Sequence, residues 1–188
     1  LGWQEDGQWP GRTLVPLAQG APEWLGGRKL LRSADGHLLE ARAASLFAAR
    51  ARPPGIGADD KWVRVDVGAG ALVAYQGDRP IYAAAISPGA HGADPQGEHR
   101  TPPGRYRVHA KWLTSDMGGR LGQGAWRTRE VPWVAYYDGS YALHGAWWHD
   151  HFGRPRSHGC INLTPADSRW LFSWLDPPLP EGWYAVRA

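Results

Sequence analysis

Hydrophobic and polar residues alternate along much of this chain after residue 60, as in strands that have one buried face. In the clearest run, which starts at Trp62, Val63, Val65 and Val67 fall on one face. The predicted strands are 62–67, 71–75, 81–86, 105–112, 131–137, 141–144 and 183–187. The Gly-rich stretch 116–124 is interpreted as a long mobile loop between two of them. The pattern therefore predicts a mainly β domain, a meander or β-sandwich.

One stretch has helical spacing instead. Its apolar face consists of Trp170, Leu171, Trp174 and Leu175. Thr164 supplies an N-cap hydroxyl, Pro165 fits the first helical position, and Asp167 adds an acid in the first turn. The prolines at 177 and 178 end the run. We expect one helix here, packed against the sheet.

Residues 1–60 lack this regular pattern. They suggest a hairpin around 34–37, a short helical patch at 41–50 and a Pro/Gly-rich connector at 52–57. We interpret 1–60 as an N-terminal segment, either the tail of another module or an arm packed on the main domain. The main domain is then 61–188, and nothing in the first segment predicts a function.

Composition and charge narrow the possible functions. The chain has 188 residues with 25 Gly and 16 Pro, which suits many turns and short strands. The 12 Trp exceed what the core needs, so some are candidates for stacking on glycans. The net charge of +3 is too small to indicate nucleic-acid binding, and no Lys/Arg run supports it.

Export signals are also missing from the sequence. No stretch is apolar for long enough to cross a bilayer, and no secretory signal pattern is visible. Because the chain begins at Leu1 rather than Met, we interpret it as a processed or trimmed form.

The single cysteine, Cys160, is either a buried filler or a reactive thiol. His144 and His158 are candidates to lower its pKa, because a thiol is a useful nucleophile only as the thiolate. Gly159 lacks a Cβ, so its N–H and that of Cys160 are candidates for an oxyanion hole. The residues alone leave both interpretations open.

The segment around Cys160 resembles the signature of the L,D-transpeptidase catalytic domain. In that signature a His is followed by Ser/Thr-His-Gly-Cys, a hydrophobic residue and Asn or Arg. This chain has His144 and then the run Ser157-His158-Gly159-Cys160-Ile161-Asn162. The run Thr-Pro-Pro-Gly-Arg-Tyr at 101–106 is similar to a step that these domains carry upstream. The resemblance covers 61–188.

The resemblance implies a role for each matching residue. Cys160 is the nucleophile, and His144 is the base, oriented by the carbonyl of Gly145 and expected to hold the thiol as a thiolate. His158 and Ser157 shape the pocket, with His158 counted among the catalytic residues. The N–H groups of Gly159 and Cys160 are expected to donate to the oxyanion. No metal or cofactor is needed.

The resemblance also suggests substrate-binding residues. Asn162 is expected to be polar support, and Trp148 is similar to an aromatic residue that follows the first His in some members. Trp126 stands where some relatives carry a tyrosine in a loop over the site. Arg154 and Arg156 are candidates to hold carboxylates of the substrate, although most surface arginines have no such role.

The implied reaction is peptidoglycan cross-linking. The thiolate attacks the carbonyl of residue 3 in a stem tetrapeptide, releases D-Ala and passes the acyl group to an amine of a second stem, giving a 3→3 cross-link. Water as acceptor would make an L,D-carboxypeptidase, and a lysine of an envelope protein would anchor that protein. Carbapenems are expected inhibitors. The family's substrate implies the periplasm or cell wall.

Rival interpretations rest on weaker patterns. His149 and His151 suggest zinc together with the other site histidines, but their spacing fits no zinc motif, and loop packing is their default role. No paired-acid motif favours a glycosidase. A non-catalytic wall-binding module is disfavoured by the intact set of His144 and 157–162.

Overall fold

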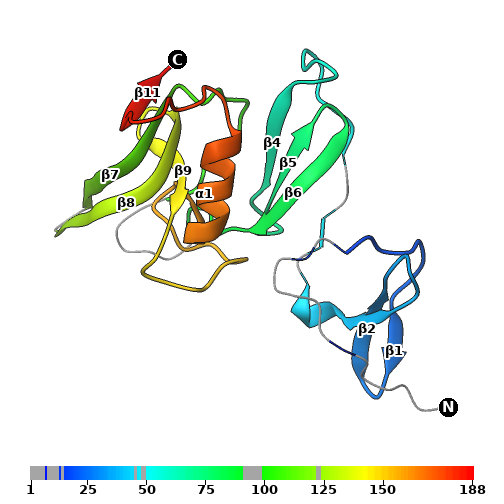
Figure 1. Cartoon of the computed structure of the whole chain (residues 1–188). Coiled ribbons are helices and arrows are strands. Elements are labelled where there is room, and N and C mark those ends of the chain that lie inside the picture. The colour runs from blue at the N-terminus through cyan, green and yellow to red at the C-terminus, as the bar shows by residue number, and fades with distance from the viewer. Residues whose placement is uncertain are drawn as a thin grey trace. The chain divides into compact units, whose positions relative to one another are not determined.

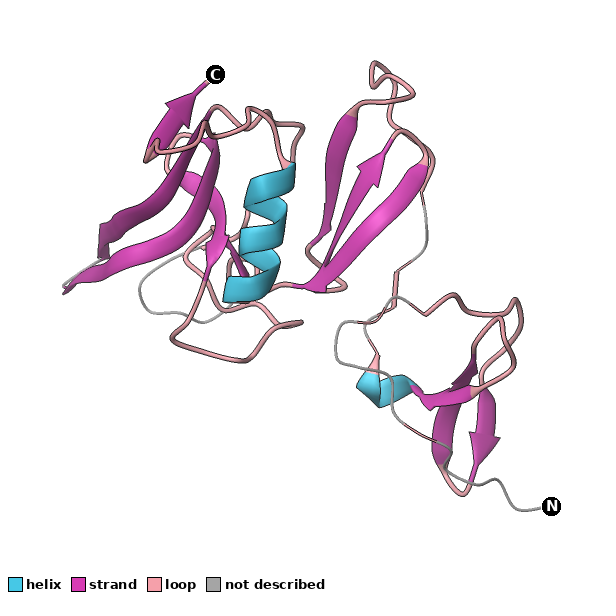
Figure 2. Ribbon diagram, viewed as in Figure 1, coloured by secondary structure: helices cyan, strands magenta, loops and turns pink. Residues whose placement is uncertain are grey.

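The computed structural model describes residues 7, 13, 15–44, 46–47, 50–90, 99–121 and 124–188, without the side chains of 120–126. The chain forms two compact units, Leu1–Ser45 and Leu46–Ala188 (Figures 1 and 2). The division at residue 60 that the sequence suggests stays a prediction.

The first unit contains a three-stranded antiparallel sheet. Its strands are β1 (Glu23–Leu25), β2 (Arg28–Arg32) and β3 (Leu38–Glu40), in that order. The expected hairpin around 34–37 is confirmed, because β2 and β3 pair across this turn. The helical patch expected at 41–50 is limited to one 3-10 turn, η1 (Ala41–Ala43), and the described residues that follow it are not helical.

The second unit begins with a three-stranded antiparallel sheet. Its strands are β4 (Lys61–Asp66), β5 (Ala71–Gln76) and β6 (Arg79–Ala85), within two residues of the predicted bounds. Trp62 and Tyr75 are cross-strand partners, and their rings stack with centroids 4.1 Å apart. This stacking holds the Trp62 ring of β4 against Tyr75 of β5.

The second sheet of this unit has the strand order β10-β9-β8-β7-β11. In chain order its members are β7 (Ala110–Leu121), β8 (Gly124–Asp138), β9 (Tyr141–Gly145), β10 (Ile161–Leu163) and β11 (Ala185–Arg187). Only the β9–β10 pair is parallel. The sequence did not predict β10, which has only three residues.

The mobile loop expected at 116–124 is wrong for the residues that the structure describes there. β7 and β8 pair along their length, out to Leu121 opposite Gly124. Gly118 pairs with Arg127, and Gly119 pairs with Trp126. Ladder hydrogen bonds need only backbone groups, so glycine continues a strand when a partner strand lies beside it.

The predicted helix is confirmed as α1 (Pro165–Trp174), capped by Thr164, whose hydroxyl accepts the Asp167 N–H at 3.1 Å. It packs between the two sheets of the second unit (Figure 1). On the β6 side, the Tyr82 and Trp170 rings stack at 3.9 Å, and the Tyr82 hydroxyl donates to Asp167 at 2.6 Å.

The core comprises Leu72, Ala74, Ala84, Ile86, Ala135, Leu143, Ile161, Leu163, Leu171 and Leu175. The mainly β fold class, with one helix after the cysteine, is confirmed.

A buried lysine ties β7 to the chain that leaves α1. The Nζ of Lys111 donates to the carbonyls of Leu175 and Pro177 at 2.6 and 2.7 Å, and it lies 4.6 Å from the Phe172 ring centroid. Burial lowers the pKa of Lys111 from 10.5 to about 8, with Asp176 opposing the shift. The unfolded chain therefore binds this proton more tightly than the folded chain does.

This difference in proton affinity predicts pH-dependent stability. Between about pH 8 and 10.5 the unfolded state holds more protons at Lys111, so the folding stability should rise with pH across this window. Measured by urea unfolding, the free energy of unfolding of the wild type should rise relative to that of Lys111→Met, by on the order of 2–3 kcal/mol from pH 7 to 10.5. A stability difference that does not change with pH would contradict the assignment.

Candidate active site

The candidate base lies on β9, and the candidate nucleophile immediately precedes β10, the parallel strand beside it. Leu143 pairs with Ile161, and His144 pairs with Asn162. Leu143 and Ile161 point into the core that α1 covers. Because side chains alternate along a strand, His144, Asn162 and the preceding Cys160 share the other face.

His144 is held as a neutral base. Its side chain is only 3% exposed, and its Nδ1 lies 3.0 Å from the Gly145 carbonyl oxygen. A carbonyl only accepts, so Nδ1 carries the proton and Nε2 keeps a free lone pair. Burial lowers the pKa of His144 to about 4, the Gly145 carbonyl opposes this, and His149 lowers the pKa further. The imidazole is therefore neutral at pH 7.

Gly145 can orient His144 because it has no side chain. A Cβ at this position would lie 2.6 Å from the Ser168 hydroxyl oxygen and 2.9 Å from Cγ of Pro132. These neighbours come from α1 and β8. The carbonyl that binds the imidazole is thus packed between a helix and a strand.

Cys160 is half-buried, and its thiol donates to the Ser140 carbonyl oxygen at 3.8 Å. The side chain packs against a small apolar cluster of Val131, Val134 and Ala142. Burial raises the pKa of this thiol, and a hydrogen bond from the Ala142 backbone lowers it by less. This shift favours a protonated resting thiol, whereas the sequence predicted a thiolate: the sulfur has apolar neighbours and a carbonyl oxygen beside it while His144 is uncharged.

Ser157 and Gly159 shape the turn that carries the thiol. The Ser157 hydroxyl donates to the Cys160 carbonyl and accepts the Gly159 N–H at 3.1 Å. Gly159 has φ +114°, and a Cβ there would lie 2.3 Å from the Tyr141 ring. The Gly159 N–H was expected to bind the oxyanion, but Ser157 already occupies it. Of the two expected donors, the Cys160 N–H stays the candidate.

Thr101, from the upstream Thr-Pro-Pro-Gly motif, braces the same turn. Its hydroxyl accepts the Gly89 N–H at 2.9 Å and donates to the Gly159 carbonyl at 3.0 Å. A Cβ on Gly89 would lie 1.9 Å from the His99 carbonyl oxygen. The motif at 101–106 thus has a structural role next to the nucleophile.

The remaining sequence-predicted residues lie around this centre. His158 is exposed and its ring packs edge-on against His99, with centroids 4.9 Å apart. Arg154 and Arg156 are exposed, and the ring of Trp148 lies 5.9 Å from that of His144. The side chain of Trp126 lies outside the described residues. The catalytic role of His158 and the substrate-binding roles stay predictions.

Asn162 has a contact that sequence reasoning missed. Its side chain is buried, and its Nδ2 lies 3.1 Å from Nε2 of His149. The sequence treated His149 as a loop-packing residue. The contact of Ser140 with the thiol was missed as well, because a single turn residue gives no signal of its own.

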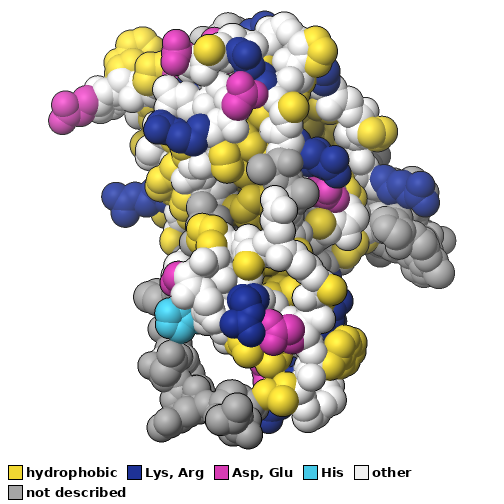
Figure 3. All heavy atoms as spheres, turned by 90° about the vertical axis from the view of Figure 1, so that its right-hand side faces the viewer, with side chains coloured by type: hydrophobic (Ala, Val, Ile, Leu, Met, Phe, Trp, Pro, Cys, Tyr) yellow, Lys and Arg dark blue, Asp and Glu magenta, His cyan; other side chains and the backbone are white. Residues whose placement is uncertain are grey.

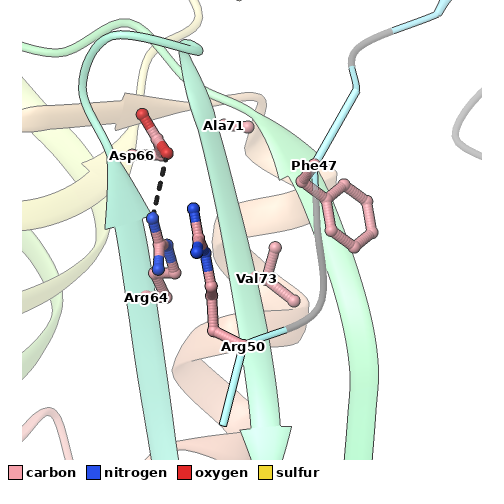
Figure 4. Close-up of a pocket in the computed structure, with 6 residues that line it drawn as sticks. All are labelled: Phe47, Arg50, Arg64, Asp66, Ala71 and Val73. Carbon is pink, nitrogen blue, oxygen red and sulfur yellow. Dashed lines mark hydrogen bonds and ion pairs between the residues drawn. The ribbon is translucent and has the colours of Figure 1, made fainter.

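Other parts of the described surface offer less. A hollow of about 30 Å³ on the β4–β5 side is lined by Phe47, Arg50, Arg64, Asp66, Ala71 and Val73 (Figure 4). Its Arg64–Asp66 ion pair is 3.2 Å long, and its lining includes no thiol or imidazole. On the face drawn in Figure 3, the Lys and Arg side chains (dark blue) are scattered among apolar and acidic ones. We therefore place the chemistry at Cys160.

The described ranges contain neither a cluster of metal ligands nor a membrane-spanning helix. There, no group of three or more His, Cys, Asp or Glu side chains converges as metal ligands would. No helix in this part of the chain is long and apolar enough to cross a membrane.

Comparison with known proteins identifies the family. The family model of the L,D-transpeptidase catalytic domain (YkuD) matches residues 60–180. A search of curated proteins found no match. The catalytic domain of an E. faecium L,D-transpeptidase has a similar fold, with a TM-score of 0.52 and 22% identity, covering 69% of this chain and 96% of that one.

Two further similar structures contain β-lactam ligands. L,D-transpeptidase 3 from Mycobacterium tuberculosis, in complex with a faropenem-derived adduct, has a TM-score of 0.50 and 19% identity, covering 58% of this chain and 54% of that one. LdtMt1 in complex with imipenem has a TM-score of 0.50 and 21% identity, covering 58% and 51%. This chain spans about half the length of these two proteins. The family match extends over more than half of the chain and includes His144 and Cys160, so the chain belongs to the L,D-transpeptidase catalytic domain family.

Proposed function

We propose that this chain is a peptidoglycan L,D-transpeptidase in which Cys160 is the nucleophile and His144 is the base. The observation that carries the proposal is the state of His144, which is buried and neutral, with its Nδ1–H bound to Gly145. Nε2 is then the ring atom that can accept a proton, on the strand beside the one that Cys160 precedes. Family membership supplies the substrate class.

In the first step, Nε2 of His144 takes the thiol proton while the sulfur attacks the carbonyl carbon of residue 3 in a stem tetrapeptide. This carbonyl usually belongs to the L-centre of diaminopimelate. The Cys160 N–H donates to the oxyanion that forms. The amide bond to the terminal D-Ala then breaks, and the imidazolium returns its proton to the leaving amine. A thioester on Cys160 remains, and His144 is neutral again.

In the second step, an amine of another stem attacks the thioester. His144 takes the proton that this amine loses and gives it to the departing sulfur, so that the thiol is restored and a 3→3 cross-link is formed. Water in place of the amine would give an L,D-carboxypeptidase, and a lysine of an envelope protein would give protein anchoring. All three reactions use the same acyl-enzyme, so products distinguish them.

The surroundings of the thiol support further parts of the proposal. Arg154 and Arg156 are exposed in the segment before Cys160, where they can reach carboxylates of the stem peptide. Trp148, which is 38% exposed beside His144, offers an apolar wall. We propose acylation by carbapenems through the same thiol, as the imipenem complex of the similar LdtMt1 suggests. Such a substrate is found in the periplasm or cell wall, where we expect the protein to act.

Incubation with purified disaccharide-tetrapeptide should give a dimer whose mass is that of two substrates less one D-alanine. The Cys160→Ala variant should give no product, because the acyl-enzyme cannot form. His144→Gln should lower the rate roughly 10²- to 10⁴-fold through loss of the base. Mass spectrometry of the products measures all three.

His151→Gln is the matched control. This histidine is exposed in the segment between β9 and β10, so the variant should keep wild-type activity. Tripeptide without dimer would move the function to a carboxypeptidase. Unchanged substrate with the wild type would contradict the proposed function.

The state of the thiol gives a second prediction. Alkylation of Cys160 by iodoacetamide should follow a titration whose midpoint lies above the ordinary cysteine pKa of about 8.5, because burial raises the pKa of this thiol. His144→Gln should leave this profile unchanged, since a neutral imidazole does not stabilise a resting thiolate. The mass of the singly alkylated protein, followed against pH, measures the rate. Fast alkylation that is constant down to pH 6 would show a resting thiolate and contradict the neutral pair.

A further inference from the structure

The segment between the two site strands is anchored at several points. The Ala146 N–H donates to the Leu163 carbonyl at 2.8 Å, and the Ser87 hydroxyl donates to the His151 carbonyl at 3.0 Å. Between these anchors, His149 is half-buried while its neighbour Asp150 is exposed. The His149 ring lies against Phe152 with centroids 4.8 Å apart. His149 is therefore turned toward the protein.

The partner of His149 is a fixed group beside the base. Asn162 exchanges two backbone hydrogen bonds with Ser87, both 2.9 Å long, and it pairs in register with His144. Its Nδ2 lies 3.1 Å from Nε2 of His149. The Trp148 ring lies 5.9 Å from the His144 ring and 6.2 Å from the His149 ring. The Asn162 side chain thus contacts His149 while its backbone pairs with His144, and the Trp148 ring lies near both imidazoles.

This arrangement fixes the protonation state of His149. With the Asn162 amide oriented so that Nδ2 faces the ring, Nε2 of His149 accepts and the ring is neutral, with its proton on Nδ1, a buried atom for which the described residues supply no partner. Protonation would turn Nε2 into a donor, and the bond would be lost unless the amide turned over. It would also put a positive charge beside the imidazolium that His144 becomes when it takes the thiol proton.

We propose that His149 is a positioning residue for His144, and that the base works only while His149 is neutral and bound to Asn162. The inference rests on the proposed role of His144 as the base. A neutral His149 holds Trp148 against the His144 ring, whereas a charged His149 opposes proton transfer from Cys160. Nothing in this role requires His149 to touch the substrate.

The charged groups around His149 determine when it titrates. Burial is the first cause that lowers its pKa, Arg156 and His151 lower it further, and Asp150 raises it. From β9, His144 is uncharged until its own pKa of about 4. Burial lowers the pKa of both imidazoles, and His149 is the less buried of the two. The rate should then fall as His149 takes up its proton, at a pH below the ordinary histidine value of 6.5.

The test is the rate of Cys160 acylation by imipenem between pH 4 and 8. In His149→Gln the amide oxygen can accept from Asn162 but cannot be protonated, so we expect a near wild-type rate at pH 7 and an acid limb moved down by about one pH unit. In His149→Leu the hydrogen bond is lost, and the rate at pH 7 should fall about tenfold. The control His37→Gln, an exposed histidine of the first unit, should follow the wild-type profile. A His149→Gln profile that overlays the wild type would overturn the inference.

A second measurement separates this inference from the proposed function. Long-range ¹H–¹⁵N spectra of the imidazoles report the His149 tautomer and the His144 titration without any reaction. We expect His149 with its proton on Nδ1 and, in His149→Gln, a His144 titration at higher pH because the repulsion is gone. A wild type that imipenem does not acylate would count against the proposed chemistry at Cys160. A His144 titration that His149→Gln does not move would overturn the inference whatever the reactivity.

Discussion

The parallel pairing of β9 with β10 is the constraint on which the candidate site depends. It joins two strands separated by the fifteen residues 146–160 and sets His144 opposite Asn162. The pairing puts Leu143, Ile161 and Leu163 into the core beneath α1, so the site face is determined by burial of the other face. A register slip of one residue would turn the site side chains into the core. The stability of the sheet and the geometry of the site therefore have a common cause.

The neutrality of both reacting groups follows from where this pairing places them. His144 is buried and the thiol of Cys160 is surrounded by apolar side chains, so a resting ion pair would cost desolvation of two charges. A neutral pair avoids that cost. Charge then develops during attack, when the substrate oxyanion meets a backbone donor and the proton is already shared with Nε2.

Local signals in the sequence predict the elements that form by local interactions. The helix follows from the Thr164 cap, Pro165 and the Trp170 face, and the first strands of the second unit follow from alternation. The strand β10 gives no such signal, because its three residues form a strand only with β9 on one side and Ser87 on the other. The sequence predicts a loop at 116–124 because the glycines there conceal pairing between β7 and β8 that only a partner strand supplies.

The site follows the same division. The identities of Cys160 and His144 are predictable because one motif carries them. The state of the thiol is not predictable, since Val131 and Val134, about thirty residues upstream, determine its surroundings. The motif also does not predict that the Gly159 N–H already has a partner. Ser157 binds it through a turn whose shape depends on Thr101. A motif specifies which groups are present, whereas contacts between distant segments decide their charge and their free hydrogen-bonding capacity.

The base is supported more rigidly than the nucleophile. Gly145 fits against Ser168, and Tyr82 holds the same helix to the first sheet of the unit through Asp167. Pro132, the other neighbour of Gly145, lies between Glu130 and Trp133, which have φ values of +51° and +49°. Such conformations cost on the order of 1–3 kcal/mol each, and they persist only where the surrounding packing over-determines them. The strained positions of β8 thus flank Pro132, which lies beside the residue that orients His144. The Cys160 turn, by contrast, is braced by the hydroxyls of Ser157 and Thr101, which can adjust as the sulfur changes from thiol to thioester.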